Sequence, residues 1–164
     1  MKIGKEIALE AKRKGICKEW YNMLMNVTQH SQLANIYFRG DDWAMEYDFP
    51  SVELLKKYAG VAAYGLITDG SGKYVNKHRL AFFGNSDVEL EYNGYGVGNI
   101  IVRHNSQAKI RVKDEAVLFV NLLDNATVQI ECTEDAKVIV YAYGNLENVI
   151  AKGNVQIKKS SWQR

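Results

Sequence analysis

Cysteine, proline and histidine are scarce in this 164-residue chain, which contains two, one and three of them respectively. Cys17 and Cys132 lie far apart and do not make the disulfide framework of a small secreted domain, so we expect two free thiols in a reducing compartment. The N-terminus lacks the apolar run of a signal peptide, and no stretch reaches the roughly 18 apolar residues that a membrane helix needs. The sequence therefore predicts a soluble protein that is cytoplasmic where it is synthesised.

Charge of one sign is lacking as well. The 21 basic and 19 acidic residues are interspersed and leave a net charge of +2, which argues against a polycation that binds nucleic acid or membranes. An apolar fraction of 47% is typical of a globular chain, and a chain of this length can bury a core without disulfides or metals. We therefore expect protein partners rather than nucleic acid or lipid.

Sequence motifs typical of catalytic, metal-binding or phosphate-binding sites are also few. None of the three histidines has a second ligand at metal-binding spacing. The glycine-rich stretch at residues 94–98 lacks the following helix that a phosphate-binding loop requires. The sequence therefore predicts no cofactor and no metal, and it favours a protein that is not an enzyme.

An enzyme is nevertheless one alternative, and two features of the sequence could support it. The segment Asp41–Asp48 contains four carboxylates, and clustered carboxylates can hold a cation or act as acid and base. Their spacing does not match a calcium-binding loop, and a solvated connection is the simpler interpretation. The second basis is Cys17 acting with a distant histidine, although the sequence places no histidine beside it.

The second half of the chain does contain a short repeat. Each copy has a serine or acidic residue, then an alanine, then two apolar residues at alternate positions; the copies are Ser106–Val112, Asp114–Val120, Asp124–Ile130 and Glu134–Val140. Their alanines, at positions 108, 116, 126 and 136, are 8, 10 and 10 residues apart. Because alternate residues of a strand share a face, the following residues are expected to point inward: Ile110, Val112, Leu118, Val120, Val128, Ile130, Val138 and Val140.

A repeat of this kind predicts an architecture. A module of about ten residues cannot bury its apolar face alone, but stacked modules share a continuous core, and two strands per coil give about 20 residues per turn. The sequence therefore predicts an α+β protein whose residues 85–158 form a β-solenoid, with the helices of residues 1–60 capping one end. The alternative is an antiparallel β-sandwich or jelly roll in which each copy is one arm of a hairpin.

Residues 1–60 have the apolar spacing of helices. The predicted helices are Ile3–Lys14, Ile16–Val27, a short helix from Ser31 to Phe38, and a fourth that begins at Ser51 and ends at Gly60. Alternation then predicts a strand over Val61–Thr68, a turn at Asp69–Gly72 and a return strand, so that residues 61–84 form a connecting hairpin. Residues 159–164 are expected to form a polar tail.

Two groups of residues are candidates for binding. Arg103, His104 and Asn105 form the densest polar cluster at a predicted corner, and with Tyr95 they would suit a carbohydrate or another small ligand. Val117 and Phe119 make the second copy of the repeat apolar on both faces. Such a strand is either buried beneath the helices or forms an interface with another chain.

Four stretches, Lys5–Lys12, Gly15–Trp20, Phe49–Ser51 and Val102–Ser106, resemble small uncharacterised proteins encoded in phage and prophage regions of gut bacteria. These motifs carry no named chemistry, so the resemblance implies no catalytic residues. It implies a phage-related accessory or assembly component, present in the cytoplasm or incorporated into a phage particle. With the repeat, the prediction is a non-enzymatic structural or protein-interaction module that binds a protein partner or itself, with the carbohydrate-binding module and the enzyme as alternatives.

Overall fold

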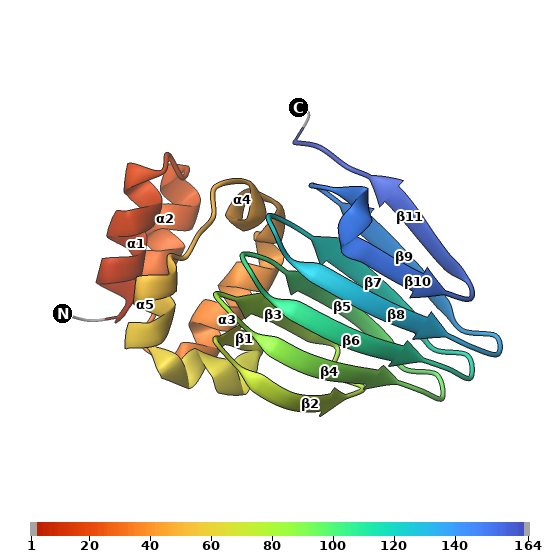
Figure 1. The fold of residues 1–164 in the computed structure, drawn as a ribbon. Helices are drawn as coiled ribbons and strands as arrows, with labels where there is room; N and C mark the ends of the chain where they lie inside the picture. The colour runs from red at the N-terminus through yellow and green to blue at the C-terminus, as the bar shows by residue number, and fades with distance from the viewer. Residues whose placement is uncertain (1–2, 163–164) are drawn as a thin grey trace. The chain divides into compact units, whose positions relative to one another are not determined.

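The computed structural model describes residues 3–162, and the chain divides into two compact units between Leu66 and Ile67. Helices make up the first unit and parallel strands make up the second (Figure 1). The division falls inside the segment that the sequence predicts to be a connecting hairpin.

Short helices build the first unit. They are α1 (Ile3–Arg13), α2 (Lys18–Met25), α3 (His30–Arg39), α4 (Asp41–Glu46), α5 (Val52–Lys57) and a 3-10 helix, η1 (Ala59–Tyr64). The first two predicted helices are confirmed as α1 and α2, although α2 is shorter at both ends. Ser51 is the N-cap of α5, as predicted, because its hydroxyl oxygen accepts the N–H of Leu54 at 3.3 Å.

The start of the third helix differs from the prediction. α3 begins at His30, so Ser31 lies within the helix and does not cap it. The side-chain oxygen of Gln32 accepts the N–H groups of Thr28 and Gln29, at 2.8 and 3.0 Å. These bonds satisfy donors at the helix start that would otherwise lack partners, so the helix can begin one residue earlier.

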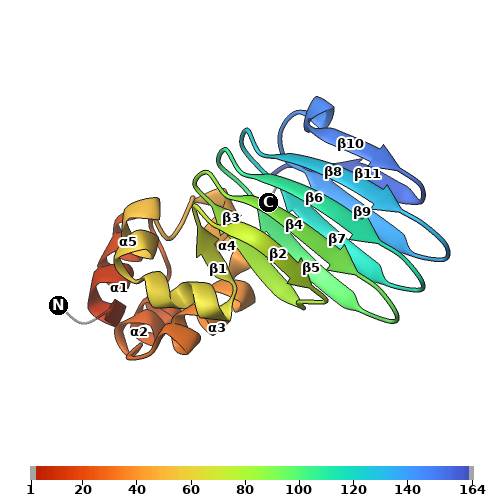
Figure 2. The same cartoon turned by 60° about the horizontal axis from the view of Figure 1, so that its bottom comes forward.

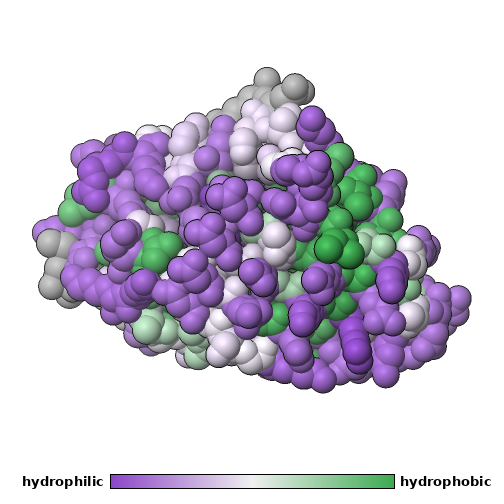
Figure 3. Space-filling view, in the orientation of Figure 1, coloured by the Kyte–Doolittle hydropathy of each residue, from purple (hydrophilic) through white to green (hydrophobic). Residues whose placement is uncertain are grey.

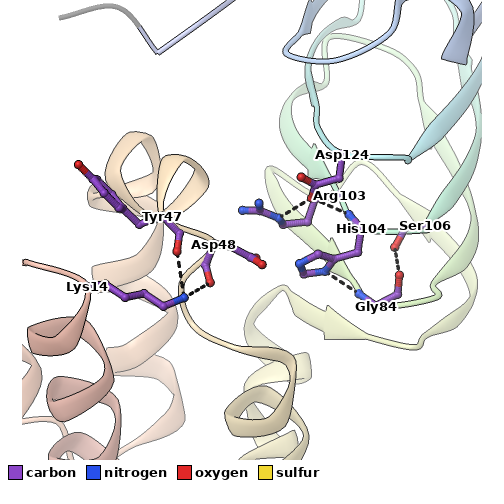
Figure 4. Close-up of polar contacts among 8 residues, drawn as sticks. All are labelled: Lys14, Tyr47, Asp48, Gly84, Arg103, His104, Ser106 and Asp124. Carbon is purple, nitrogen blue, oxygen red and sulfur yellow. Dashed lines mark hydrogen bonds and ion pairs between the residues drawn. The ribbon is translucent and has the colours of Figure 1, made fainter.

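Two further local predictions are wrong. The acidic segment forms the helix α4 up to Glu46 and is not a simple connection, although Asp42 and Asp48 are exposed to solvent as predicted. Asp41 and Asp42 occupy the first turn of α4, where the helix dipole favours carboxylates. The Nζ of Lys14 donates to the carbonyl oxygens of Tyr47 and Asp48 just after this helix, at 2.9 and 2.7 Å (Figure 4). The strand predicted over residues 61–68 is three residues long, because residues 61–64 belong to η1.

Close packing of α1 fixes the arrangement within the helical unit. A Cβ atom on Gly4 would lie 2.5 Å from the carbonyl oxygen of Leu24, so only glycine allows α1 to approach the end of α2 this closely. On the other side, the Glu6 carboxylate accepts hydrogen bonds from Lys57 Nζ at 2.6 Å and Tyr58 Oη at 2.7 Å. These bonds lower the pKa of Glu6 and tie α1 to the end of α5.

Short strands of similar length build the second unit. They are β1 (Leu66–Thr68), β2 (Ser71–Val75), β3 (Arg79–Phe83), β4 (Asp87–Tyr92), β5 (Val97–Val102), β6 (Gln107–Val112), β7 (Val117–Leu122), β8 (Thr127–Cys132), β9 (Lys137–Ala142), β10 (Val149–Lys152) and β11 (Val155–Lys159), with a 3-10 turn, η2 (Leu146–Asn148), before β10. The odd-numbered strands form one sheet and the even-numbered strands form the other.

The pairing of these strands confirms a β-solenoid of about four turns. Every recorded pair is parallel, and Asp87 pairs with Gln107, which pairs with Thr127, so the repeat is 20 residues. Consecutive strands therefore lie in opposite sheets, and each coil stacks on the preceding one (Figures 1 and 2). An antiparallel sandwich or jelly roll would pair consecutive strands within a sheet, so that alternative is excluded.

Residues 61–84 do not form the predicted hairpin. β1 and β3 are neighbours in the odd-numbered sheet, whereas β2 pairs in parallel with β4 in the other sheet. The predicted turn contains Asp69 with a φ of 52°, the left-handed conformation that turns the later corners as well. The segment therefore supplies the first coil of the solenoid and does not connect to it as a separate element.

The corners follow a ten-residue period that the alanines only partly reveal. Residues with positive φ recur at Gly84, Gly94, His104, Asp114, Asp124 and Glu134. Two residues after most of them stands a small buried residue, namely Ser86, Ser106, Ala116, Ala126 and Ala136. Ser106 is therefore the equivalent of the later alanines, and the predicted alignment of the first copy by Ala108 is wrong by two residues. A shift of two leaves the same face inward, so the predicted core is unaffected.

The core of the solenoid consists of these inward-facing residues. All eight residues predicted to point inward are at most 3% exposed. Three of the strands also contribute a third inward residue that the repeat did not include, namely Leu122, Cys132 and Ala142. The result is a continuous apolar interior between the two sheets.

Candidate functional site

The polar cluster predicted from sequence lies at the corner between β5 and β6, where it joins successive coils (Figure 4). The N–H of Gly84 donates to His104 Nδ1 at 2.9 Å, and the N–H of His104 donates to Asp124 Oδ2 at 3.0 Å. Arg103 Nε donates to the same carboxylate oxygen at 3.2 Å. Each of these hydrogen bonds joins a corner residue to the equivalent corner of the next coil, 20 or 21 residues later, so together they hold successive coils against each other.

The structure does not bring Tyr95 to this cluster. Tyr95 follows β4, at the corner where the chain passes from the even-numbered sheet to the odd-numbered one, and it is 82% exposed. Arg103, His104 and Asn105 follow β5, at the opposite corner of the coil. The residues predicted to bind a carbohydrate or small ligand therefore do not share one surface.

Val117 and Phe119 lie on the outward face of β7. Their neighbours across the sheet are Val97 on β5 and Ile139 on β9. Val97 is 48% exposed, while the other three are partly buried. The outward apolar strip predicted from the second repeat copy is present in the fold, and its use as an interface stays a prediction.

The two cysteines differ in access. Cys17 is exposed at the N-cap of α2, and Cys132 is buried at an inward position of β8. Burial raises the pKa of the Cys132 thiol, although a hydrogen bond from the backbone of Asn154 acts in the opposite direction. The buried Cys132 thiol therefore lacks the lowered pKa typical of a nucleophilic thiol.

The last coil, made of β10 and β11, departs from the regular repeat. Val149 pairs with Val128, 21 residues earlier, and Val155 pairs with Val138, only 17 residues earlier. The 3-10 turn η2 precedes β10, and Gly153 joins β10 to β11 with a φ of 94°. The corner pattern that repeats every ten residues along the stack therefore ends here.

Core-facing side chains of this coil are uncovered. Ala151 pairs with Ile130 and Ile157 pairs with Val140, so both occupy inward positions. Ile157 is nevertheless 41% exposed, whereas its neighbour Val140 is fully buried. Ala151 and Ile157, together with the exposed Leu146 and with Ile150, which pairs with Gln129 and faces outward, form the open-end patch. Figure 3 shows hydrophobic side chains gathered over β10 and β11.

Two strand edges are also open at this end. Among residues 3–162, β10 and β11 are the outermost strands of their sheets, so each pairs with a neighbour on one side only. The N–H of Val138 donates to the carbonyl oxygen of Asn154 at 3.1 Å, and the N–H of Ser160 donates to that of Ala142 at 2.8 Å. Because parallel ladders alternate, the N–H and C=O groups of Ile157 and Lys159 point away from β9.

Basic side chains predominate at the open end, where Glu147 of η2 is exposed as an acidic neighbour of Leu146. The sequence from Val149 to Trp162 has no aspartate or glutamate and contains three lysines, Lys152, Lys158 and Lys159. The preceding coils differ, because opposite charges alternate along the outward face of the even-numbered sheet; Arg111 lies 4.0 Å from Glu131. The open-end patch is therefore bordered by basic side chains.

Sequence reasoning missed this site, although the sequence contains a trace of it. The repeat of apolar pairs stops after Val140, and Gly144, Asn145, Gly153 and Asn154 interrupt the strands that follow. The sequence predicts strands in this region and a polar tail after them, but an alternating pattern does not show whether that tail covers the last strands. Exposure of an inward position depends on the neighbouring coil, which a periodic pattern does not report.

Residues 3–162 contain neither a metal-binding cluster nor a membrane-spanning helix. No group of three or more His, Cys, Asp or Glu side chains in this range is arranged to hold a metal ion. Within the same range, no helix is long and apolar enough to cross a membrane. Comparisons of the chain with protein-family models, with curated proteins and with solved structures give no match.

Proposed function

We propose that this protein is a non-enzymatic interaction module that binds another protein chain at the open end of its β-solenoid. The observation that carries this proposal is that the last coil exposes inward-facing residues and two unpaired strand edges. A solenoid normally covers its ends with a polar cap, and an exposed edge strand with apolar side chains is a template for pairing. A partner chain would supply both the missing backbone pairing and the missing cover.

The energetic reason for this binding lies in two isoleucines. Ile150 and Ile157 are 61% and 41% exposed. Complete burial of an isoleucine side chain contributes about 1.5–3 kcal/mol, so covering the remaining exposed part of each contributes on the order of 1 kcal/mol. Each backbone hydrogen bond formed at the edge adds about 0.5–1.5 kcal/mol. These contributions favour a specific but reversible complex.

The resemblance to proteins of phage and prophage regions supports a biological setting for this activity. We propose that the module is an accessory or assembly component of a phage or another mobile element. In that setting the solenoid would serve as a rigid support that presents one end to its partner. Detection of the protein in purified phage particles from a producing strain would test this part of the proposal.

Site-specific photocrosslinking in the producing cells tests the proposed binding. A benzophenone amino acid placed at position 157 lies in the open-end patch, and the same group at Tyr95 provides a control that is also exposed but lies on a corner. We expect a discrete crosslinked product from position 157 and none from position 95. Equal labelling from both positions, or none from either, would contradict the proposal.

A further inference from the structure

We propose that the partner at the open end is an extended acidic segment of another protein, which adds as a further strand to the free edge of β11. This inference rests on the proposed function and specifies its partner. In strand addition, main-chain hydrogen bonds give affinity, and pockets and charges at alternate positions give specificity. Both kinds of contact can be assigned to residues of the last coil.

The backbone of β11 offers a defined set of groups to such a strand. Gln156, Lys158 and Ser160 direct their N–H groups to β9, as the register and the bond from Ser160 to Ala142 show. Ile157 and Lys159 direct their N–H and C=O groups to the open edge. The N–H of Val155 is already used, since it donates to Gly153 at 2.9 Å. A partner strand would therefore bind mainly beside residues 157–159.

Side-chain positions along β11 define the partner's sequence. A residue placed beside Val155 or Ile157 would point to the interior, as their own neighbours Val138 and Val140 do, and should be apolar. A residue beside Lys158 would point outward next to an ammonium group and should be acidic. Lys159 lies on the same face as Ile157, since it pairs with Ala142, but it is exposed at the end of the strand, so it favours a second carboxylate there. A partner strand in parallel orientation would therefore have the pattern apolar, polar, apolar, acidic, acidic beside residues 155–159.

Charge argues for an acidic partner and against a second copy docked end to end. Lys158 Nζ lies 5.9 Å from the centre of the Tyr141 ring, and Lys159 pairs with Ala142, so neither has a carboxylate beside it in the register. Lys152 differs, because it pairs with Glu131 on β8. Two open ends brought together would juxtapose Lys158 and Lys159 with their own copies, and like charges opposite each other are destabilising.

Binding of short fluorescent peptides to the full-length protein tests the inference. The probe is acetyl-Gly-Val-Thr-Ile-Glu-Glu-Gly with a fluorophore at its C-terminus, and the matched control replaces both glutamates with lysine. Fluorescence anisotropy should show the acidic peptide binding at least tenfold more tightly than the basic one. Raising the salt concentration should weaken the binding of the acidic peptide only, because salt screens its exposed ion pairs with the protein.

Two sets of variants locate the binding on β11. The double variant Lys158→Glu, Lys159→Glu should bind the acidic peptide about tenfold or more weakly and the basic peptide more tightly. Each exposed ion pair contributes up to about fivefold in affinity. Ile157→Pro removes an N–H that points to the open edge without removing a bond to β9, whereas Ile157→Val keeps it. We expect Ile157→Pro to abolish binding and Ile157→Val to retain it, with unchanged thermal unfolding in both.

The outcomes separate this inference from the proposed function. Equal binding of the acidic and basic peptides, sensitive to Ile157→Pro, would overturn the acidic partner while the open end remained a binding site. Acidic binding that is insensitive to Ile157→Pro would overturn the site on β11. A dimer in sedimentation that Ile157→Pro abolishes would show that a second copy occupies the end and would overturn the inference. Absence of peptide binding, together with no crosslink from position 157, would overturn both proposals.

Discussion

Replacement of Asp114 tests how the corners hold the coils together. Asp114 has a φ of 60°, and its Oδ2 accepts the N–H of Gly94 at 2.8 Å. Asp114→Ala removes this acceptor, which costs about 1 kcal/mol, and places alanine in the left-handed region, which costs about 1–2 kcal/mol more. We therefore expect the free energy of unfolding to fall by about 2–3 kcal/mol.

Two further replacements at this position separate the two causes. Asp114→Gly loses the acceptor but adopts positive φ without strain, so the expected loss is about 1 kcal/mol. Asp114→Asn keeps both a side-chain oxygen and tolerance of the left-handed region, so the expected loss is below about 0.5 kcal/mol. Asp135→Ala, at an exposed position of the next equivalent corner, should change stability by less than about 0.5 kcal/mol.

Urea unfolding followed by circular dichroism in the β-sheet band gives these free energies. The expected order of stability is wild type, then the asparagine, glycine and alanine variants. If glycine destabilised as much as alanine, backbone conformation would not matter at the corner. If alanine were neutral, the hydrogen bond between coils would not hold the stack, and the reasoning would be refuted.

Two further predictions concern titratable side chains. Hydrogen bonds from Lys57 and Tyr58 lower the pKa of Glu6, so the stability that this carboxylate contributes is present above its ordinary pKa near 4.3 and is lost as the pH falls through its lower folded value. Glu6→Gln should flatten the acid limb of a stability-against-pH curve, and an unchanged limb would contradict the assignment. Cys17 is exposed while Cys132 is buried with a raised pKa, so a thiol reagent should label one cysteine quickly in the folded protein and the second only on unfolding; rapid labelling of both would contradict the burial of β8.

The β-solenoid could be predicted because its core depends on a local rule. Ile110, Val112, Val128 and Ile130 alternate with polar residues, and strand alternation alone puts them inside. The alignment of the first repeat copy could not be predicted by matching alanines, because Ser106 occupies the position at its corner that Ala116 occupies at the next one. What the corner requires is a small side chain two residues after a left-handed residue, and several residue types satisfy that requirement.

The remaining errors have a common physical cause. The hairpin that the sequence predicts at Asp69 is wrong because a turn sequence indicates only a reversal of the chain and not which sheet the next strand joins. The sequence predicts a ligand site or a simple turn at Arg103, His104 and Asn105, whereas the His104 side chain accepts a backbone N–H from the preceding coil and its own N–H donates to Asp124 of the next. The open end was missed for the same reason. Contacts between coils depend on residues about 20 positions apart, and local patterns do not encode them.

Amide hydrogen exchange on β11, resolved residue by residue by NMR, tests the central claim most directly. In the free protein, Gln156 and Lys158 should exchange slowly because they bond to β9, while Ile157 and Lys159 should exchange quickly because they face the open edge. Addition of the acidic peptide should slow amide exchange at Ile157 and Lys159 by at least tenfold and leave the exchange rates of Gln156 and Lys158 unchanged. Slow exchange at Ile157 and Lys159 in the free protein, or no change there when the peptide is bound, would contradict the account.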